Sequence, residues 1–443
     1  MKSTPVFLMM LTLALTGACA AAGPIRTIST ATPVMTQTTL HADTPAPTPV
    51  NSPRPGTASK PLPTEAKKTS DPGPICASVS EIPRSECEAL AAFYLHTGGE
   101  NWIMNNEEWV NKDIWLQTNT PCSWAGVACD EGRVTEIVLG LNGLSGEIPP
   151  EIGDLTKLTR LDLTDNDLSS VPAEIGKLTN LTELNLAFND LSSLPAEIGD
   201  LANLTALYLA GNRLSRMPEI SKLTKLTALN LAENDLSSLP MGTGNLKNLA
   251  GLNLASNNLS SLPAETGNLI NLSELRLNDN NLDGLPSEIG NLTNLTGLEL
   301  SENNLSSLPP EIGNLVNLNN LYLSGNHLST LPPEIGNLTN LSELSLSGNG
   351  LSSVPAEIGS LVNLNYLNLS DNELNSVPPE IGKLTDLTLL YLDGNNLSSI
   401  PPEIGNLVNL AELWLADNNL STLPPELCAG LTGVVIPPSL CAP

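Results

Sequence analysis

The stretch LNLSDNELNSVPPEIGKLTDL, residues 367–387, recurs with small changes from about residue 134 to residue 427. One asparagine aligns in every copy, and its spacing is 23 residues except for 24 after the first copy and 22 after the fourth. The thirteen equivalent positions are Asn142, Asn166, Asn189, Asn212, Asn234, Asn257, Asn280, Asn303, Asn326, Asn349, Asn372, Asn395 and Asn418. A fixed period over so many copies predicts a repeat architecture and not a set of separate compact domains.

The two halves of each copy predict different local structures. In LTELNL (181–186), Leu184 and Leu186 alternate with polar residues, as in a short strand with one buried face. In the return half SSLPAEIGDL (192–201), proline followed by glutamate is typical of the start of a short helix. Twelve of the thirteen copies carry this glutamate, from Glu151 to Glu426. The asparagine is expected to turn inward and to hydrogen-bond backbone groups of neighbouring copies.

The repeat has the form L-x-x-L-x-L-x-x-N-x-L over residues 133–427, which resembles the leucine-rich repeat family. The resemblance implies an α/β solenoid, a horseshoe of about thirteen coils with disulfide-bonded caps. Its concave side would carry a parallel sheet, and its convex side short helical or 3-10 turns. Residues 121–153 also resemble the N-terminal cap of plant receptor-type repeat proteins. In that family the two cysteines pair, which implies a Cys122–Cys129 disulfide with Trp124 packed over the first coil.

The N-terminal region predicts export. Residues 1–20 are read as a signal peptide, with an apolar run from Val6 to Leu15 followed by small residues. Its end, LTGAC, resembles the lipobox of bacterial lipoproteins, in which Cys19 becomes the lipidated first residue. Thr16 stands where that pattern usually has leucine, and ordinary cleavage after Ala20 or Ala22 is the alternative. The first repeat has the plant-type form LSGEIPPEIG (144–153), whereas later repeats have the form LSSLPPEIG (305–313), which resembles bacterial and intracellular repeat proteins. This mixture, together with the leader, favours a bacterial surface protein.

Residues 21–75 are rich in proline, threonine and serine and contain no aromatic side chain, so we expect a disordered linker. Beyond Cys19, six cysteines form three sequence-local pairs that flank the repeats: Cys76 with Cys87, Cys122 with Cys129, and Cys428 with Cys441. Disulfides in an oxidising compartment fit this placement. A metal site is the alternative, but the spacings do not match zinc pairs and only three histidines are present. We expect an N-terminal cap at 76–132, repeats at 133–427, a C-terminal cap at 428–443, and no metal or other cofactor.

Charge and motifs exclude several functional classes. With 47 acids against 19 bases, the chain is not expected to bind nucleic acid, or a membrane except through a lipid anchor at Cys19. It has no histidine beside a plausible nucleophile, no Cys/His cluster and no phosphate-binding glycine loop, so we do not expect an enzyme. Asp162 and Asp165 could mimic a glycosidase pair, but they are expected to lie open to water, where raised pKa values are hard to obtain.

Residues four and six positions before each asparagine are expected to point outward on the concave face. Aromatic, apolar and charged residues in these positions are the candidate binding residues: Arg276, Tyr322, Tyr366, Leu389, Tyr391 and Trp414. The last four come from three consecutive coils and predict one contiguous patch. Alternatively, the C-terminal tail covers this patch as part of a lid.

These patterns favour an exported, non-catalytic module that binds a protein or polysaccharide on its concave face. It would be held at the cell surface by a lipid or be secreted. A passive spacer or surface-layer element is the alternative, but a spacer would need no aromatic side chains concentrated on one face.

Overall fold

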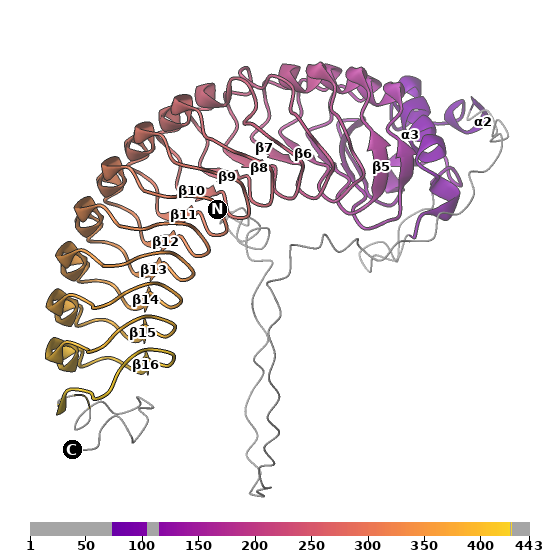
Figure 1. Cartoon of the computed structure of the whole chain (residues 1–443). Helices are drawn as coiled ribbons and strands as arrows, with labels where there is room; N and C mark the ends of the chain where they lie inside the picture. Colours follow the sequence, from indigo (N-terminus) through magenta and orange to yellow (C-terminus); the bar gives the residue numbers. More distant parts are fainter. Residues whose placement is uncertain (1–72, 104–114, 426, 428–443) are drawn as a thin grey trace, which may run out of the picture. The chain divides into compact units, whose positions relative to one another are not determined.

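A computed structural model describes residues 73–103, 115–425 and 427. Within this part of the chain, the repeats stack as coils of a curved solenoid, with the strands on the inner side and short 3-10 turns on the outer side (Figure 1). The predicted horseshoe is confirmed. The signal peptide, Cys19 and most of the linker lie outside the described residues.

The concave face is one 14-stranded sheet. Strands β1 and β2 pair antiparallel, and from β2 onward each strand runs parallel to its neighbour in an unshifted register, as where Leu275 lies opposite Leu298. Strands β3 and β5 form a separate two-stranded sheet. The bounds are β1 Val127–Asp130, β2 Arg133–Val138, β3 Ser145–Glu147, β4 Arg160–Asp162, β5 Asp167–Ser170, β6 Glu183–Asn185, β7 Ala206–Tyr208, β8 Ala228–Asn230, β9 Gly251–Asn253, β10 Glu274–Arg276, β11 Gly297–Glu299, β12 Asn320–Tyr322, β13 Glu343–Ser345, β14 Tyr366–Asn368, β15 Leu389–Tyr391 and β16 Glu412–Trp414.

The convex side consists of 3-10 helices, most of which start after a proline and carry a glutamate in the first turn, as predicted. Their bounds are η4 Pro150–Asp154, η5 Ala173–Lys177, η6 Ala196–Asp200, η7 Thr243–Asn245, η8 Ala264–Asn268, η9 Ser287–Asn291, η10 Pro310–Asn314, η11 Pro333–Asn337, η12 Ala356–Ser360, η13 Pro379–Lys383 and η14 Pro402–Asn406. The helix-start prediction is wrong for Glu219, because the shorter 22-residue coil that contains it forms no such helix.

The interior is filled by leucines and by the asparagine ladder. Asn303, which is 4% exposed, illustrates the ladder. Its Nδ2 donates to the carbonyl of Leu277 in the preceding coil at 2.9 Å and to that of Leu300 in its own coil at 3.0 Å. Its Oδ1 accepts from the backbone N–H of Leu282 at 3.0 Å. From Asn166 to Asn418 each asparagine joins two coils in this way and satisfies backbone groups that would otherwise be buried without a partner, whereas the Asn142 amide donates to Gly140 of its own coil.

The N-terminal cap closes the first coil. Its helices are α2 Gly73–Cys76 and α3 Arg84–His96, followed by the 3-10 turns η1 Gly99–Asn101 and η3 Pro121–Ser123. Disulfides join Cys76 to Cys87 and Cys122 to Cys129, as predicted. Within the described stretches, no helix is both long and apolar enough to span a bilayer.

The third predicted disulfide belongs to the C-terminal cap. Cys428 lies outside the described residues, and Cys441 lies outside them as well. The described part of the chain contains two disulfides, both in the N-terminal cap. The Cys428–Cys441 disulfide and the C-terminal cap at 428–443 stay predictions.

Buried polar and aromatic contacts hold the N-terminal cap to the sheet. The fully buried Glu86 of α3 bonds the Arg133 guanidinium and accepts the Val134 backbone N–H at 2.8 Å, so its charge is compensated. Trp124 is fully buried, and its ring packs on that of Trp115 with centroids 5.3 Å apart. Buried side chains of the cap and leucines of the first coil belong to one hydrophobic core, so the cap closes this end of the solenoid.

Candidate binding surface on the concave face

Three aromatic side chains form a row across the last strands of the sheet. The rings of Tyr366 and Tyr391 have centroids 5.7 Å apart, and those of Tyr391 and Trp414 are 6.0 Å apart. We call these three residues the aromatic ladder. Leu389 lies opposite Tyr366 in the register and belongs to the same patch. The unshifted pairing of β14, β15 and β16 places residues from three coils side by side, so this part of the predicted patch is contiguous.

The ladder is accessible and carries a carboxylate within it. Trp414 is 53% exposed, and Tyr391 and Leu389 are half-buried. Glu412 Oε2 accepts from the Tyr391 hydroxyl at 3.0 Å and from Trp414 Nε1 at 3.1 Å. Burial, and then the hydrogen bond to Glu412, raise the pKa of the Tyr391 phenol. The carboxylate therefore fixes two of the three rings while remaining exposed itself. The tail that would form the predicted lid lies outside the described residues.

The other two candidate residues lie apart from this patch. Tyr322 in β12 donates its hydroxyl to the Glu343 carboxylate of the next coil, and burial together with that contact raises its pKa. Arg276 in β10 lies beside Glu299 of β11. Burial raises the pKa of Glu299, and the positive charge of Arg276 partly opposes that rise. Six strand spacings of about 4.8 Å separate Arg276 from Trp414, roughly 29 Å in total. The structure thus divides the six candidates into one patch and two separate positions.

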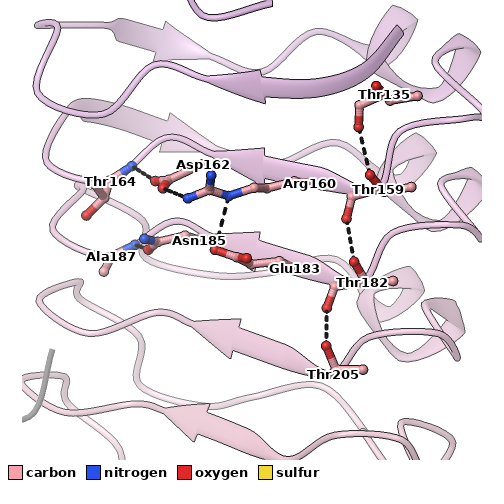
Figure 2. Close-up of polar contacts among 10 residues, drawn as sticks. All are labelled: Thr135, Thr159, Arg160, Asp162, Thr164, Thr182, Glu183, Asn185, Ala187 and Thr205. Carbon is pink, nitrogen blue, oxygen red and sulfur yellow. Dashed lines mark hydrogen bonds and ion pairs between the residues drawn. The ribbon is translucent and has the colours of Figure 1, made fainter. Parts of the chain in front are cut away.

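A second polar cluster occupies the N-terminal part of the same face. Arg160 Nη2 lies 3.1 Å from Asp162 Oδ2, and its Nε lies 3.3 Å from Glu183 Oε1 (Figure 2). The Asp162 side chain is only 13% exposed, and burial raises its pKa although Arg160 opposes that effect. The expectation that Asp162 lies open to water is therefore wrong. Its partner is Arg160 and not a second carboxylate. Among the described residues, no group of three or more His, Cys, Asp or Glu is arranged to hold a metal ion.

The repeats match the family described as leucine-rich repeat region in overlapping stretches, residues 138–231, 174–275, 211–302, 255–353 and 344–432. The chain is a leucine-rich repeat protein. Curated relatives of this leucine-rich repeat protein include phytosulfokine receptor 2 of Arabidopsis thaliana, 43% identical over 63 residues. A probable inactive receptor kinase of the same plant is 47% identical over 58 residues. The matches cover 13% of this chain and only 6% and 9% of those relatives.

Solved structures resemble a larger part of this leucine-rich repeat protein. A leucine-rich repeat protein of Leptospira interrogans is 38% identical with a TM-score of 0.56, and the match covers 65% of this chain and 79% of that one. The complex of PEPR1 with AtPEP1 gives 33% identity and a TM-score of 0.69 over 78% of this chain and 50% of that one. The plant peptide hormone receptor RGFR1, in complex with RGF2, is 34% identical with a TM-score of 0.57, and the match covers 69% of this chain and 58% of that one.

Several contacts of this leucine-rich repeat protein were not anticipated from sequence. Hydroxyls at the start of successive strands donate to the preceding coil, as when Thr182 bonds the Thr159 carbonyl at 2.9 Å (Figure 2). A second, exposed row of asparagines also links coils; Asn317, for example, donates to the Thr293 carbonyl at 2.8 Å. Tyr208 packs against a small cluster of buried alanines, Ala187, Ala210 and Ala232. The recurrence of Thr/Ser and Asn at fixed repeat positions was the available signal for the first two rows.

Proposed function

We propose that this leucine-rich repeat protein is an exported, non-catalytic module that binds a protein ligand on the C-terminal part of its concave face. The observation that carries the proposal is the aromatic ladder with its exposed Trp414. Tyrosine and tryptophan are among the residues that most often dominate the energy of protein interfaces. Two of the similar structures described above are complexes, of PEPR1 with AtPEP1 and of a peptide hormone receptor with RGF2, which supports a protein partner over a purely structural role.

The polar clusters of the concave face support binding rather than catalysis. Asp162, a mostly buried carboxylate of this face whose pKa is raised, is held by Arg160 and accepts the backbone N–H of Thr164. The same strand position is occupied by Asn185 in the next coil and by Tyr208 in the coil after that. The Asn185 amide oxygen accepts a backbone N–H two residues later, as the Asp162 carboxylate does. Asp162 is therefore one version of a structural position in the repeat.

Photo-crosslinking tests the proposed face. p-Benzoylphenylalanine is introduced in place of Leu389 on the concave side and, as a matched control, in place of the exposed Val362 on the convex side. Both variants are incubated with the surface and secreted fractions of the source cells and irradiated. We expect protein adducts from position 389 that an excess of unlabelled wild-type protein suppresses. Identical adducts from both positions would refute the concave site, and no competed adduct from position 389 would favour a passive spacer.

The proposal includes a tether to the cell surface through a lipid on Cys19. The LTGAC sequence at the end of the apolar leader supports it. Intact mass spectrometry of membrane and secreted fractions tests the tether. A mature chain that starts at Cys19 with a diacylglycerol mass is the expected result. A chain that starts at Ala21 or Gly23 and is free in the medium would contradict it and leave a secreted binder.

The same mass measurement tests the proposed closing disulfide between Cys428 and Cys441. Alkylation without reduction is expected to leave Cys441 unmodified, because its thiol is consumed in the link to Cys428. Labelling of Cys441 in the unreduced, exported protein would contradict the pair.

A further inference from the structure

The charge of the chain changes abruptly after Arg276. From residue 277 to residue 443 there are 18 acids, no arginine and one lysine, Lys383. Between residues 73 and 276, by contrast, 26 acids accompany 12 lysines and arginines. The glutamates at the 3-10 helix starts occur in both parts and do not explain the difference. The half of the solenoid that bears the aromatic ladder is therefore the half with no arginine and a single lysine.

Part of this acidity surrounds the ladder. Asp371, Asp393 and Asp417 each follow within three residues of the ends of β14, β15 and β16. Because these strands are parallel, the three carboxylates lie along one edge of the patch. Asp371 lies against the next coil, where a Cβ added to Gly394 would be 2.4 Å from its Oδ1. Glu412 provides a fourth carboxylate within the ladder itself.

Lys383, the one lysine or arginine after Arg276, ends η13, one of the 3-10 helices of the convex side. The carboxylates of the patch therefore repel one another without a lysine or arginine on the strands after β10. Aromatic ring faces attract cations, and nearby carboxylates strengthen that preference. A neutral sugar can stack on the rings and donate its hydroxyls to the carboxylates, but it leaves their negative charge uncompensated, and an anionic sugar would be repelled.

We propose that the ligand of the aromatic ladder is a lysine- or arginine-rich, extended polypeptide segment. This inference rests on the proposed binding function and specifies the chemistry of the partner. Alternate residues of an extended chain lie about 6.6 Å apart, close to the ring spacing of the ladder. Successive cationic side chains can thus lay their aliphatic stems over Leu389 and the rings. Their charged ends then reach Glu412 and the aspartates at the edge.

Binding of short defined probes tests the inference. The full-length mature protein is titrated with a fluorescent ten-residue peptide of alternating lysine and glycine, at several salt concentrations. The same length of alternating glutamine and glycine, and a neutral hexasaccharide of N-acetylglucosamine, are the comparison probes. We expect binding of the lysine peptide alone, with an affinity that falls steadily as salt rises.

Variants locate the binding. Glu412→Gln keeps the hydrogen-bond acceptor and removes one charge, and we expect it to weaken lysine-peptide binding about fivefold. Trp414→Ala is expected to weaken it at least about tenfold. Glu380→Gln in η13 is the matched control, with the same charge change on the convex side, and should change the affinity less than about twofold. Thermal denaturation confirms that each variant is folded.

Each other outcome overturns the inference in a distinguishable way. Equal losses for Glu412→Gln and Glu380→Gln would mean that only the overall negative charge attracts the peptide. Binding of the glutamine peptide or the hexasaccharide that Trp414→Ala abolishes, without a preference for lysine, would refute the cationic ligand and leave the concave binding face standing. If no probe binds while position 389 still forms competed adducts, the cationic inference alone fails. If both experiments are negative, the binding function fails as well.

Discussion

Replacing Asn303 by alanine tests the physical basis of the solenoid. The carbonyls of Leu277 and Leu300 each keep a second amide donor in the variant, from Asn280 and Asn326 respectively. The Leu282 N–H, however, loses Asn303 Oδ1, the acceptor with which it bonds. A buried N–H without a partner costs about 1–3 kcal/mol, and the lost donor contacts of the amide add about 1 kcal/mol. We therefore expect the free energy of unfolding to fall by about 3 kcal/mol.

Asn317→Ala is the matched control for this prediction. It removes the same side chain and also breaks one inter-coil hydrogen bond, but that bond is exposed and water can replace it. We expect a loss below about 1 kcal/mol. Urea denaturation followed by far-ultraviolet circular dichroism measures both variants. Equal losses for the two variants, or a loss below about 1 kcal/mol for Asn303→Ala, would refute the claim that the buried asparagines stabilise the solenoid by bonding buried backbone groups.

Further predictions concern the core, the polar cluster and the cap. Leu344→Ala, at a fully buried position of β13, should cost about 3 kcal/mol in urea denaturation, whereas exposed Val362→Ala should cost less than about 0.5 kcal/mol; similar values would contradict the assigned packing. Because burial raises the folded-state pKa of Asp162, its contribution to stability is present at low pH and lost as pH rises through that pKa. Asp162→Asn should therefore be more stable than wild type near neutral pH and equal to it only in acid below the unfolded-state pKa of the carboxyl, and a pH-independent difference would argue against this origin. Cys122→Ser with Cys129→Ser should lower the free energy of unfolding by about 2.5 kcal/mol, measured against wild type under oxidising conditions, and no change would mean that this link does not constrain the unfolded chain.

The fold could be predicted almost completely from the repeat, because each coil contacts mainly its neighbours. The spacing of the asparagines determines which residues lie side by side, so the alignment of Tyr366 with Leu389 and of Tyr391 with Trp414 followed from counting. The prediction was wrong at Glu219, where the coil is one residue shorter and the 3-10 helix does not form. In that coil Glu219 follows Pro218 directly, and Ser221 stands where the other coils have glycine.

The caps follow from sequence to different extents. The two N-terminal disulfides lie where the cysteine spacing and the plant-type motif predicted them. The pair of Cys428 with Cys441 rests on spacing alone, because neither Cys428 nor Cys441 belongs to the described residues. A repeat period determines the coils but says little of a tail that no longer repeats.

The chemistry of the concave face was less predictable. Glu412 was not among the candidate binding residues, but it lies within the aromatic ladder and bonds two of its side chains. Asp162 was expected to be solvated, yet the neighbouring Arg160 contacts it and most of the side chain is buried. Both differences depend on side-chain orientation between adjacent coils. A column position tells which face a residue occupies but not how far its side chain leans toward the next strand.

Affinity for the partner recovered at position 389 tests the central claim most directly. The double variant Tyr391→Ala/Trp414→Ala is compared with wild type and with the convex variant Val362→Ala by isothermal titration calorimetry. Two interface anchors that each contribute about 2 kcal/mol predict a loss of affinity of at least about a hundredfold, with no loss for the convex variant. An affinity within about twofold of wild type for the folded double variant would show that the aromatic ladder does not bind the partner.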